Sequence, residues 1–173
     1  MAVRPILNFD QPVLREKAKK VPRVDTSIQK LLDDLAETML DAPGAGLAAN
    51  QIGVLLRVCV VKGDENQIWG LVNPVIVKSA GSQVGYEGCL SKPGWVGEVE
   101  RYDAVVVKGL NRHGKQVRIK STGFTARAFQ HELDHLDGVL FTDRLTSLDT
   151  LRRVEDLVGE EQEEAEAVAA ASG

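Results

Sequence analysis

The sequence lacks any long apolar run: no stretch approaches the roughly eighteen residues that a membrane-spanning helix requires. Cysteine is scarce, and Cys59 and Cys89 are too few for a disulfide scaffold. The N-terminal segment has no uninterrupted apolar core followed by small residues, so we expect no secretory signal. Basic residues are not in excess, because the net charge is −4, which argues against a nucleic-acid-binding surface. We therefore expect a soluble, cytoplasmic protein that neither enters a membrane nor reads nucleic acid directly.

The composition that remains is typical of a folded globular protein. The 173 residues are 43% hydrophobic and 27% charged, and a chain of this length buries about two thirds of its unfolded surface. We expect a single domain over residues 1–173. From about residue 160 to 173 an acidic run is followed by alanines, which predicts a solvated or frayed tail.

The spacing of apolar residues predicts one early helix and then strands. The helix is expected from about residue 26, capped by Asp25 or one of the next two residues, and it ends before Pro43-Gly44. Short segments rich in β-branched residues follow, punctuated by Gly, Asn and Pro. The expected strands are 55–61, 69–77, 96–102, 105–110 and 116–119, the last two joined by a hairpin loop.

Helical character returns after these strands. Residues 124–136 contain no Gly or Pro, and Gly138 stands where a helix would be closed. A further apolar stripe predicts a helix from 148 to about 168. A helix, then strands, then helices predict an α+β fold rather than a parallel βαβ array.

The most specific local signal is the segment His131-Glu132-Leu133-Asp134-His135. Residues four apart share a helix face, so His131 and His135 can bind one metal ion. Glu132 would lie near the ion without ligating it, where it can take a proton from metal-bound water and pass it to a leaving amine. Two of the three histidines in the chain form this pair, which weighs against unrelated surface histidines. The motif predicts a metal-dependent hydrolase of an amide bond.

Two nitrogen ligands leave such a site one protein ligand short, since catalytic sites commonly use three and a water. A further histidine after Gly138 is excluded, because Phe141 occupies that position. Glu155 on the downstream helical segment is one candidate. Cys89 is the other: it lies among glycine and proline residues that predict a turn, and a thiolate is a strong ligand. Cys59 lies within a β-branched run and is assigned to the core.

A run of small residues over 43–53 carries one long amide side chain, Gln51. The run lacks both GxGxxG and Gly-Lys-Ser/Thr, which argues against a phosphate-binding loop. Two interpretations remain open. The run is either a tight loop with an exposed Gln51, or a backbone that lets a substrate approach while Gln51 donates a hydrogen bond to a developing oxyanion.

The chain resembles the bacterial-type peptide deformylases in three motifs that occur in the same order: GAGLAANQ, EGCLS and HELDH. The resemblance runs from residue 10 to at least residue 145. Members of this family remove the N-terminal formyl group from formyl-methionyl nascent peptides and release formate. The resemblance therefore implies a deformylase-like catalytic domain with an α+β fold, in which antiparallel strands surround the metal-binding helix and a C-terminal helix follows.

The resemblance also implies roles for individual residues. The metal ligands would be Cys89, His131 and His135, and Glu132 would act as general base and acid. The side-chain amide of Gln51 and the backbone N–H of Leu90 would bind the oxyanion. The expected substrate-binding residues are Ala45, Gly46, Leu47, Glu87, Gly88, Phe124, Arg127 and Ala128.

The sequence itself also predicts where some of these residues lie. Phe124 and Ala128 precede His131 by seven and three residues, so both lie near the ligand face of the helix and could line an apolar methionine pocket. Simple core packing is an equal interpretation for Phe124. Glu87 is expected to orient the cysteine segment by hydrogen bonding. Arg101 is expected at a solvated strand end.

The ion and the partners follow from the resemblance too. Family members usually carry Fe²⁺, while Zn²⁺, Ni²⁺ or Co²⁺ can occupy the site, and a His₂Cys donor set suits several of these ions. We expect a monomer that acts on formyl-methionyl nascent peptides, with the ribosome as a further candidate partner. Lys92 stands where members often carry an apolar residue, so the rim of the substrate cleft is expected to differ.

The sequence is compatible with two other functions. The first is a metallopeptidase that cuts internal peptide bonds and uses Glu155 as its third ligand. The second is a peptide-binding module that has lost its chemistry. The presence of Gln51, Cys89 and Glu132 beside both histidines argues against the second.

Overall fold

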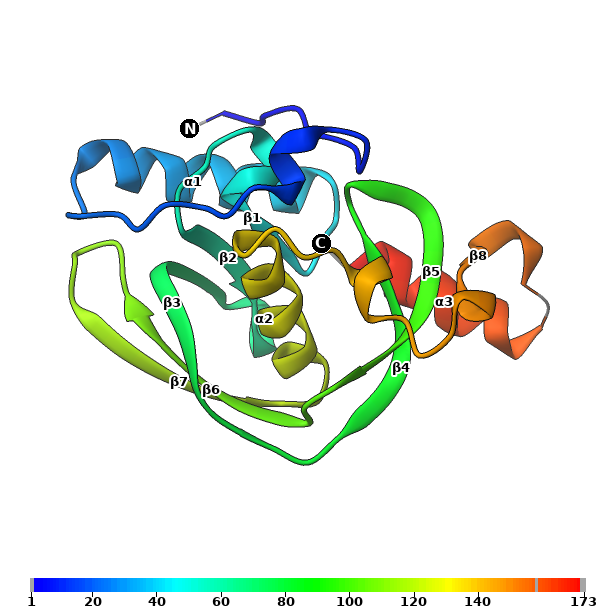
Figure 1. Ribbon diagram of the computed structural model, residues 1–173. Helices are drawn as coiled ribbons and strands as arrows, with labels where there is room; N and C mark the ends of the chain where they lie inside the picture. The colour runs from blue at the N-terminus through cyan, green and yellow to red at the C-terminus, as the bar shows by residue number, and fades with distance from the viewer. Residues whose placement is uncertain (1, 158, 172–173) are drawn as a thin grey trace.

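The computed structural model describes residues 2–157 and 159–171 (Figure 1). The helices are α1 (Thr26–Asp41), α2 (Gly123–Leu136) and α3 (Glu160–Ala171). The strands are β1 (Gly46–Ala48), β2 (Val58–Lys62), β3 (Ile68–Ala80), β4 (Gln83–Cys89), β5 (Lys92–Arg101), β6 (Ala104–Leu110), β7 (Gln116–Thr122) and β8 (Arg152–Arg153). Short 3₁₀ helices are η1 (Pro12–Arg15), η2 (Ala49–Ile52), η3 (Asp64–Asn66), η4 (Phe141–Arg144), η5 (Leu148–Thr150) and η6 (Val154–Asp156). The α+β fold expected from the sequence is confirmed.

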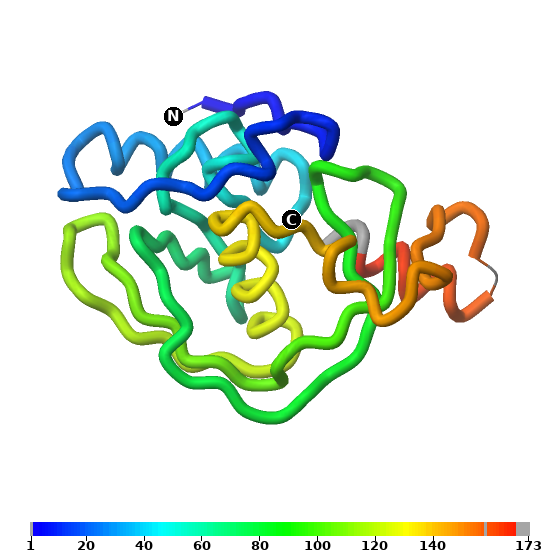
Figure 2. The backbone as a smooth tube through the Cα atoms, in the orientation of Figure 1, coloured from blue at the N-terminus to red at the C-terminus, as the bar shows by residue number. Residues whose placement is uncertain are grey.

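The strands form two antiparallel sheets, and α2 lies in the middle of the molecule between them (Figure 1). One sheet has the order β1-β2-β3-β6-β7 and the other has the order β4-β5-β8. Two short connections, residues 81–82 and 102–103, carry the chain from the first sheet to the second and back beneath α2 (Figure 2). The strands therefore surround the helix that carries the HELDH motif.

The central position of β2 explains its unbroken run of apolar residues. Val58 and Val60 pack against the α1 side of the sheet, whereas Cys59 and Val61 pack in the cluster that includes α2. Successive strand residues point to opposite faces, so a strand covered on both faces must be apolar throughout. Cys59 is a core residue as expected, and burial raises the pKa of its thiol, which keeps it protonated.

The boundaries of α1 and α2 follow the local sequence. The Asp25 side chain accepts a hydrogen bond from the Ile28 N–H and caps α1, whose apolar face is buried. Beyond α2, Gly138 has a φ of +73°, and a Cβ at this position would lie 2.6 Å from the Arg15 carbonyl oxygen. Only glycine satisfies both constraints, so the chain turns there. Among the described residues, no helix is long and apolar enough to cross a membrane.

Two expected elements have other bounds in the structure. The turn expected around Cys89, from Gly85 to Pro93, is confined to residues 90–91, and its two glycines lie within β4, since Gln83 to Gly88 pair in register with Arg101 to Val96 of β5. The expected helix over 148–168 is broken, because Arg152 and Arg153 instead pair with β5. In both places, pairing with a distant strand overrides local propensity.

Part of the expected acidic tail forms α3, which packs on the three-stranded sheet (Figure 1). Ala165 is fully buried in a small cluster with Tyr86, Val96, Val154 and Leu157, while the glutamates of the helix are exposed. Residues 172–173 lie outside the described residues. Of the α3 side chains whose burial the structure describes, only that of Ala165 is fully buried.

Candidate metal centre

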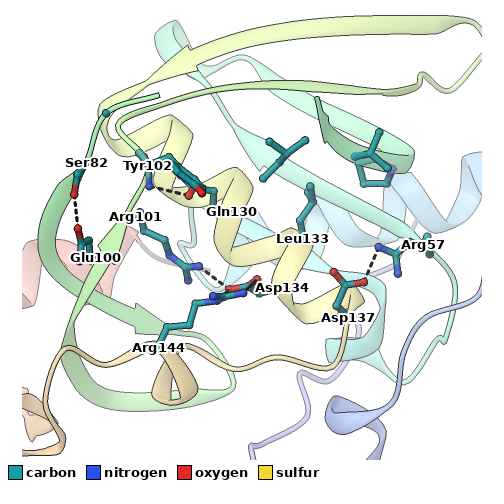
Figure 3. Close-up of a pocket in the computed structure, with 14 residues that line it drawn as sticks. Arg57, Ser82, Glu100, Arg101, Tyr102, Gln130, Leu133, Asp134, Asp137 and Arg144 are labelled. Carbon is teal, nitrogen blue, oxygen red and sulfur yellow. Dashed lines mark hydrogen bonds and ion pairs between the residues drawn. The ribbon is translucent and has the colours of Figure 1, made fainter. Parts of the chain in front are cut away.

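Two sides of α2 offer candidate sites. One side borders an open hollow of about 570 Å³ at the junction of the two sheets (Figure 3). The charged side chains that line this hollow are mostly paired with one another: Arg101 and Arg144 with Asp134, and Arg57 with Asp137. The other side carries nucleophilic and metal-binding groups packed within a few ångströms of one another. The chemistry therefore lies on that second side.

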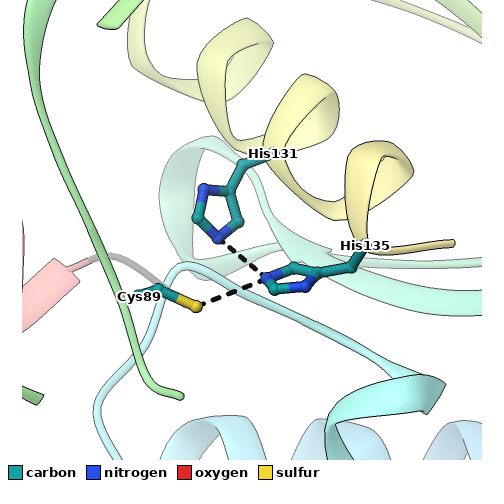
Figure 4. Close-up of side chains that lie close together, drawn as sticks. All are labelled: Cys89, His131 and His135. Atoms are coloured by element: carbon teal, nitrogen blue, oxygen red, sulfur yellow. Dashed lines mark hydrogen bonds between the residues drawn. The ribbon is translucent and has the colours of Figure 1, made fainter. Parts of the chain in front are cut away.

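Three potential metal ligands converge there (Figure 4). His131 and His135 project from α2, and Cys89 is the last residue of β4. Their ligand atoms lie within 4.8 Å of one another, with Cys89 Sγ 3.3 Å from His135 Nε2 and the two Nε2 atoms 3.1 Å apart. All three residues are buried. One thiolate and two imidazoles form a donor set that suits a divalent transition ion.

Glu155, the other candidate for the third ligand, lies elsewhere. Its side chain is 72% exposed and forms an ion pair with Arg153. A strand pairing at Arg152 and Arg153 draws this segment to the edge of β5 instead of continuing a helix. The metallopeptidase alternative therefore loses its ligand.

Glu132 lies against this cluster and is almost fully buried. Its Oε1 is 4.0 Å from His131 Nε2, and its Oε2 has no hydrogen-bond partner among the described residues. Burial raises the pKa of Glu132 to about 7; Glu87 and Asp134 act in the same direction, while His131 and Arg101 oppose them. A carboxyl group that titrates near neutrality is suited both to accept and to return a proton.

Gly46 on β1 faces Glu132 at close range. A Cβ at this position would lie 2.7 Å from Glu132 Cγ, closer than real Cβ contacts. The glycine therefore makes room for the buried carboxylate, which is a different reason from the substrate approach expected for the small-residue run.

Gln51 is fully buried, so the interpretation of an exposed amide is wrong. Its Oε1 accepts a hydrogen bond from the Ala48 N–H at 3.0 Å, and its Nε2 donates to Ser91 Oγ at 3.1 Å. The same Nε2 lies 3.6 Å from Cys89 Sγ. Leu90 follows Cys89 where the pairing of β4 with β5 shifts register, and its side chain is half-buried. The structure thus brings Gln51 and the Leu90 backbone to the cluster.

Glu87 connects the cluster to the surrounding charges. Its carboxylate accepts from His131 Nδ1 at 2.6 Å, from Arg101 at 2.5 and 3.1 Å, and from Arg127 at 2.8 Å. Burial alone would raise the pKa of Glu87, but the hydrogen bonds from His131 and Arg101 hold it far below its ordinary value. Glu87 is ionised and orients a histidine of the cluster, beyond the role in the cysteine segment expected for it.

Arg101 is not at a solvated strand end, as expected from the sequence, but is 6% exposed. Burial acts to lower its pKa, but Glu87 and Asp134 raise it above the ordinary value. The sequence held a signal only for Glu87, which is a single charged residue among small and apolar neighbours, whereas Arg101 stands among Glu98, Glu100 and Asp103. Which charges would meet depended on the β4–β5 pairing, which the sequence did not predict.

The pKa values of the two histidines are shifted in opposite directions. Burial would lower the pKa of His131, but hydrogen bonds with Cys89 and Glu87 raise it well above its ordinary value. Burial, and then the charge of His131, lower the pKa of His135 well below it. A cation that binds His131 through Nε2 must displace the proton on that nitrogen, because ligation requires a neutral imidazole.

A narrow cavity beside the cluster brings together several of the expected substrate-binding residues. It is lined by Ala45, Glu87, Phe124, Arg127, Ala128, His131 and Glu132. Phe124 is 43% exposed, so it is not a core residue. The guanidinium of Arg127 is held by Glu87 and the Val99 carbonyl.

Leu47 and Gly88 lie outside this cavity. Leu47 is fully buried in the core against α1, because strand alternation turns it away from the face of β1 that carries Gly46. Gly88 is buried within β4, one residue before Cys89. A role of these two residues in binding substrate stays a prediction.

Comparison with protein families and curated proteins gives consistent matches. The family model described as polypeptide deformylase matches residues 3–151. A peptide deformylase of Dehalococcoides mccartyi (strain CBDB1) is 52% identical over 155 residues, which cover 89% of this chain and 93% of that protein. Peptide deformylase 1 of Bacillus subtilis (strain 168) is 46% identical over 160 residues, covering 92% of this chain and all of the relative (100%).

Solved structures show the same likeness. The crystal structure of a peptide deformylase from Legionella pneumophila is 40% identical, with a TM-score of 0.78 and coverage of 97% of this chain and 94% of that one. A peptide deformylase from Synechococcus elongatus, in complex with actinonin, is 34% identical, with a TM-score of 0.80 and coverage of 99% and 90%.

Proposed function

This chain belongs to the polypeptide deformylase family and removes the N-terminal formyl group from nascent peptides, and from this premise we propose how its residues divide the reaction. Cys89, His131 and His135 hold the metal ion, and Glu132 transfers the proton. The observation that carries the proposal is the convergence of the three donors beside a buried carboxylate with an unpaired oxygen.

The proposed mechanism assigns one proton path to Glu132. A divalent ion held by the three donors would supply Lewis acidity, which in zinc sites lowers the pKa of water to about 7. Glu132 accepts a proton as water attacks the formyl carbon. When the C–N bond breaks, Glu132 returns that proton to the departing nitrogen, and the products are formate and the free amino terminus. The pKa of about 7 for Glu132 suits both transfers.

Two donors are proposed to stabilise the oxyanion of this reaction. The amide of Gln51 is fixed by Ala48 and Ser91, so it needs no reorganisation, and the Leu90 N–H follows the Cys89 ligand directly. One such donor is typically worth about 10²–10³ in rate. For the methionine side chain we propose the cavity beside the cluster, with Ala45, Phe124 and Ala128 as its apolar wall.

The finer points of the function are also proposals. We propose Fe²⁺ as the physiological ion, although the donor set suits Zn²⁺, Ni²⁺ and Co²⁺ as well. We further propose that the protein works as a monomer in the cytoplasm, where formyl-methionyl peptides emerge from the ribosome. The deformylase family and the absence of a membrane-spanning helix among the described residues support this setting.

The test is formate release from formyl-Met-Ala-Ser by protein loaded with Ni²⁺, or with Fe²⁺ in the absence of air. We expect turnover that a chelator abolishes and that added metal restores. Turnover that persists in protein shown by elemental analysis to hold no metal would contradict the proposal. Retained peptide binding without turnover in the loaded protein would instead favour a binding module.

A further inference from the structure

The proposed metal ligand His131 is held from behind by a carboxylate. His131 Nδ1 lies 2.6 Å from the Glu87 carboxylate, which leaves Nε2 to face Cys89 and His135. Such a hydrogen bond fixes the tautomer and the plane of a ligating imidazole and raises its basicity. The orientation of His131 therefore depends on what holds Glu87.

Arg101 holds Glu87 and extends the contact to a second carboxylate. Its Nε and Nη2 donate to the two oxygens of Glu87, and its Nη1 donates to Asp134 Oδ2 at 2.6 Å. Asp134 stands three residues after His131 on α2, so the contacts return to the helix from which they began. We call His131, Glu87, Arg101 and Asp134 the charge ring.

The charge ring joins three elements at the metal centre. It links α2 to β4 through Glu87 and to β5 through Arg101. Glu87 precedes Cys89 by two residues on the same strand, so the position of Glu87 against His131 also constrains the separation of Cys89 from the histidines. Two residues of the ring, Arg101 and Asp134, also line the hollow (Figure 3). There Arg144 Nε donates to Asp134 at 2.6 Å.

Stability alone does not account for this arrangement. Glu87 and Arg101 are almost fully buried, and the Asp134 side chain is only 13% exposed. Buried ion pairs of this kind are often no more stabilising than apolar residues of the same volume, because desolvation offsets the attraction. A function in orienting the ligands explains why charges occupy these positions.

We propose that Arg101 and Asp134 are positioning residues for the deformylase reaction: through Glu87 they fix the orientation of His131 and its distance from Cys89. This inference rests on the proposed function, since it takes His131 and Cys89 as metal ligands. Arg127 holds the other side of Glu87, so the carboxylate stays buried and paired when Asp134 is changed. A change at Asp134 should therefore alter geometry more than folding.

The test compares Asp134→Asn with Asp137→Asn in protein loaded with Co²⁺. Asp137 lies three residues further on and borders the same hollow, but its side chain pairs with Arg57. It contacts the ring through its backbone N–H, which donates to the Asp134 carbonyl oxygen and is kept in Asp137→Asn. We expect Asp134→Asn to shift the visible Co²⁺ spectrum and to lower metal affinity in competition titrations by about 10–100-fold, the usual range for a ligand-orienting partner. We expect kcat to fall with little change in KM, and Asp137→Asn to match the wild type in all these measurements.

Arg101→Lys separates bridging from charge, because a single ammonium cannot reproduce the two-sided contact of a guanidinium. We expect it to behave like Asp134→Asn. Arg144→Gln removes only the half-exposed outer contact and should shift the same measurements in the same direction by less.

Unchanged Co²⁺ spectra and affinities within about twofold of the wild type in Asp134→Asn and Arg101→Lys would overturn the inference, even if both lost thermal stability. A wild-type Co²⁺ spectrum in Arg101→Lys, with a shifted spectrum in Asp134→Asn, would overturn the bridging role of Arg101. Failure of the proposed function looks different: the wild type would bind Co²⁺ yet release no formate, while the spectra of the variants would still report on the ring.

Discussion

At the scale of single residues, the buried carboxylate of Glu132 is the point on which the proposed chemistry depends. Changing Glu132 to Gln preserves shape but removes the group that accepts and returns the proton. We expect formate release to fall by about 10²–10⁴-fold, the usual contribution of acid–base catalysis, with the bound metal retained. Elemental analysis and the steady-state rate measure the two effects separately.

The matched control for that change is Glu155→Gln, on an exposed side chain far from the cluster. It should leave both metal content and rate at wild-type levels. A Glu132→Gln protein that hydrolyses near the wild-type rate would show that another group transfers the proton.

The close approach of Gly46 to Glu132 gives a second residue-scale prediction. Gly46→Ala would place a Cβ 2.7 Å from Glu132 Cγ, so the carboxylate or β1 must move. We expect a loss of about 1–3 kcal/mol in the free energy of unfolding, as for other overpacked sites, and a lower kcat with metal retained. The comparison is Gly85→Ala, where the nearest atom is 3.6 Å away and belongs to the Arg127 side chain. Equal rates in the two variants would show that Glu132 adjusts freely.

At the scale of elements, η4 is capped by a titrating group. The Asp143 side chain accepts from the Leu140 N–H and pairs with Arg15. The hydrogen bond from the Arg15 guanidinium has the largest effect and lowers the pKa of Asp143 below its ordinary value of 3.8. Burial opposes this shift, and the hydrogen bond from the Leu140 N–H adds to it. A lowered pKa means that the stabilisation is present above the unfolded value and is lost as pH falls through the folded value.

We therefore expect Asp143→Asn to lower the free energy of unfolding at pH 7, by under about 1 kcal/mol because the pair is partly exposed. The difference from the wild type should shrink toward pH 3. Urea unfolding of both proteins at a series of pH values measures it. A difference that does not vary with pH would mean that the carboxylate charge is not what stabilises η4.

The attachment of α3 through Ala165 can be tested in the same way. Ala165→Glu would bury a carboxylate among Tyr86, Val96 and Leu157, whereas Ala167→Glu adds the same charge on the exposed side. We expect only the first to lower the free energy of unfolding, by about 1–3 kcal/mol for an unpaired buried polar group. Similar urea midpoints for the two variants would show that α3 detaches without cost. Since α3 supplies none of the proposed metal ligands or hydrogen-bond donors, formate release should persist in both.

The sequence also shows its limits at this scale. The helix that carries the histidines could be predicted, because its apolar spacing, its closing glycine and its motif agree. β4 could not, because Gly85 and Gly88 look like turn residues and only the pairing with β5 makes them strand. Because the β4–β5 pairing was not predicted, the contact between Glu87 and Arg101 was not predicted either. The approach of Cys89 to the histidines was predicted from the family resemblance.

At the scale of the whole molecule, the ion is expected to link a strand of one sheet to the helix between both sheets. Removal of the metal should therefore lower the melting temperature, and metal at 100 times its Kd would add about 2.7 kcal/mol. Because a cation displaces the proton of His131, affinity should weaken as pH falls through the raised pKa of that residue. Thermal melts with and without a chelator, at several pH values, measure both effects. Cys89→Ala should abolish the shift, and a shift that survives in Cys89→Ala would mean that the ion binds elsewhere.

The distribution of the donors along the chain has a consequence for synthesis. Cys89 is made long before His131 and His135, and the two regions meet only when α2 lies between the sheets. A partly synthesised chain thus has a thiol but no complete chelate, so the ion can be acquired only late in translation. Each new copy of this enzyme must finish most of its own synthesis before it can process the amino terminus of any other chain.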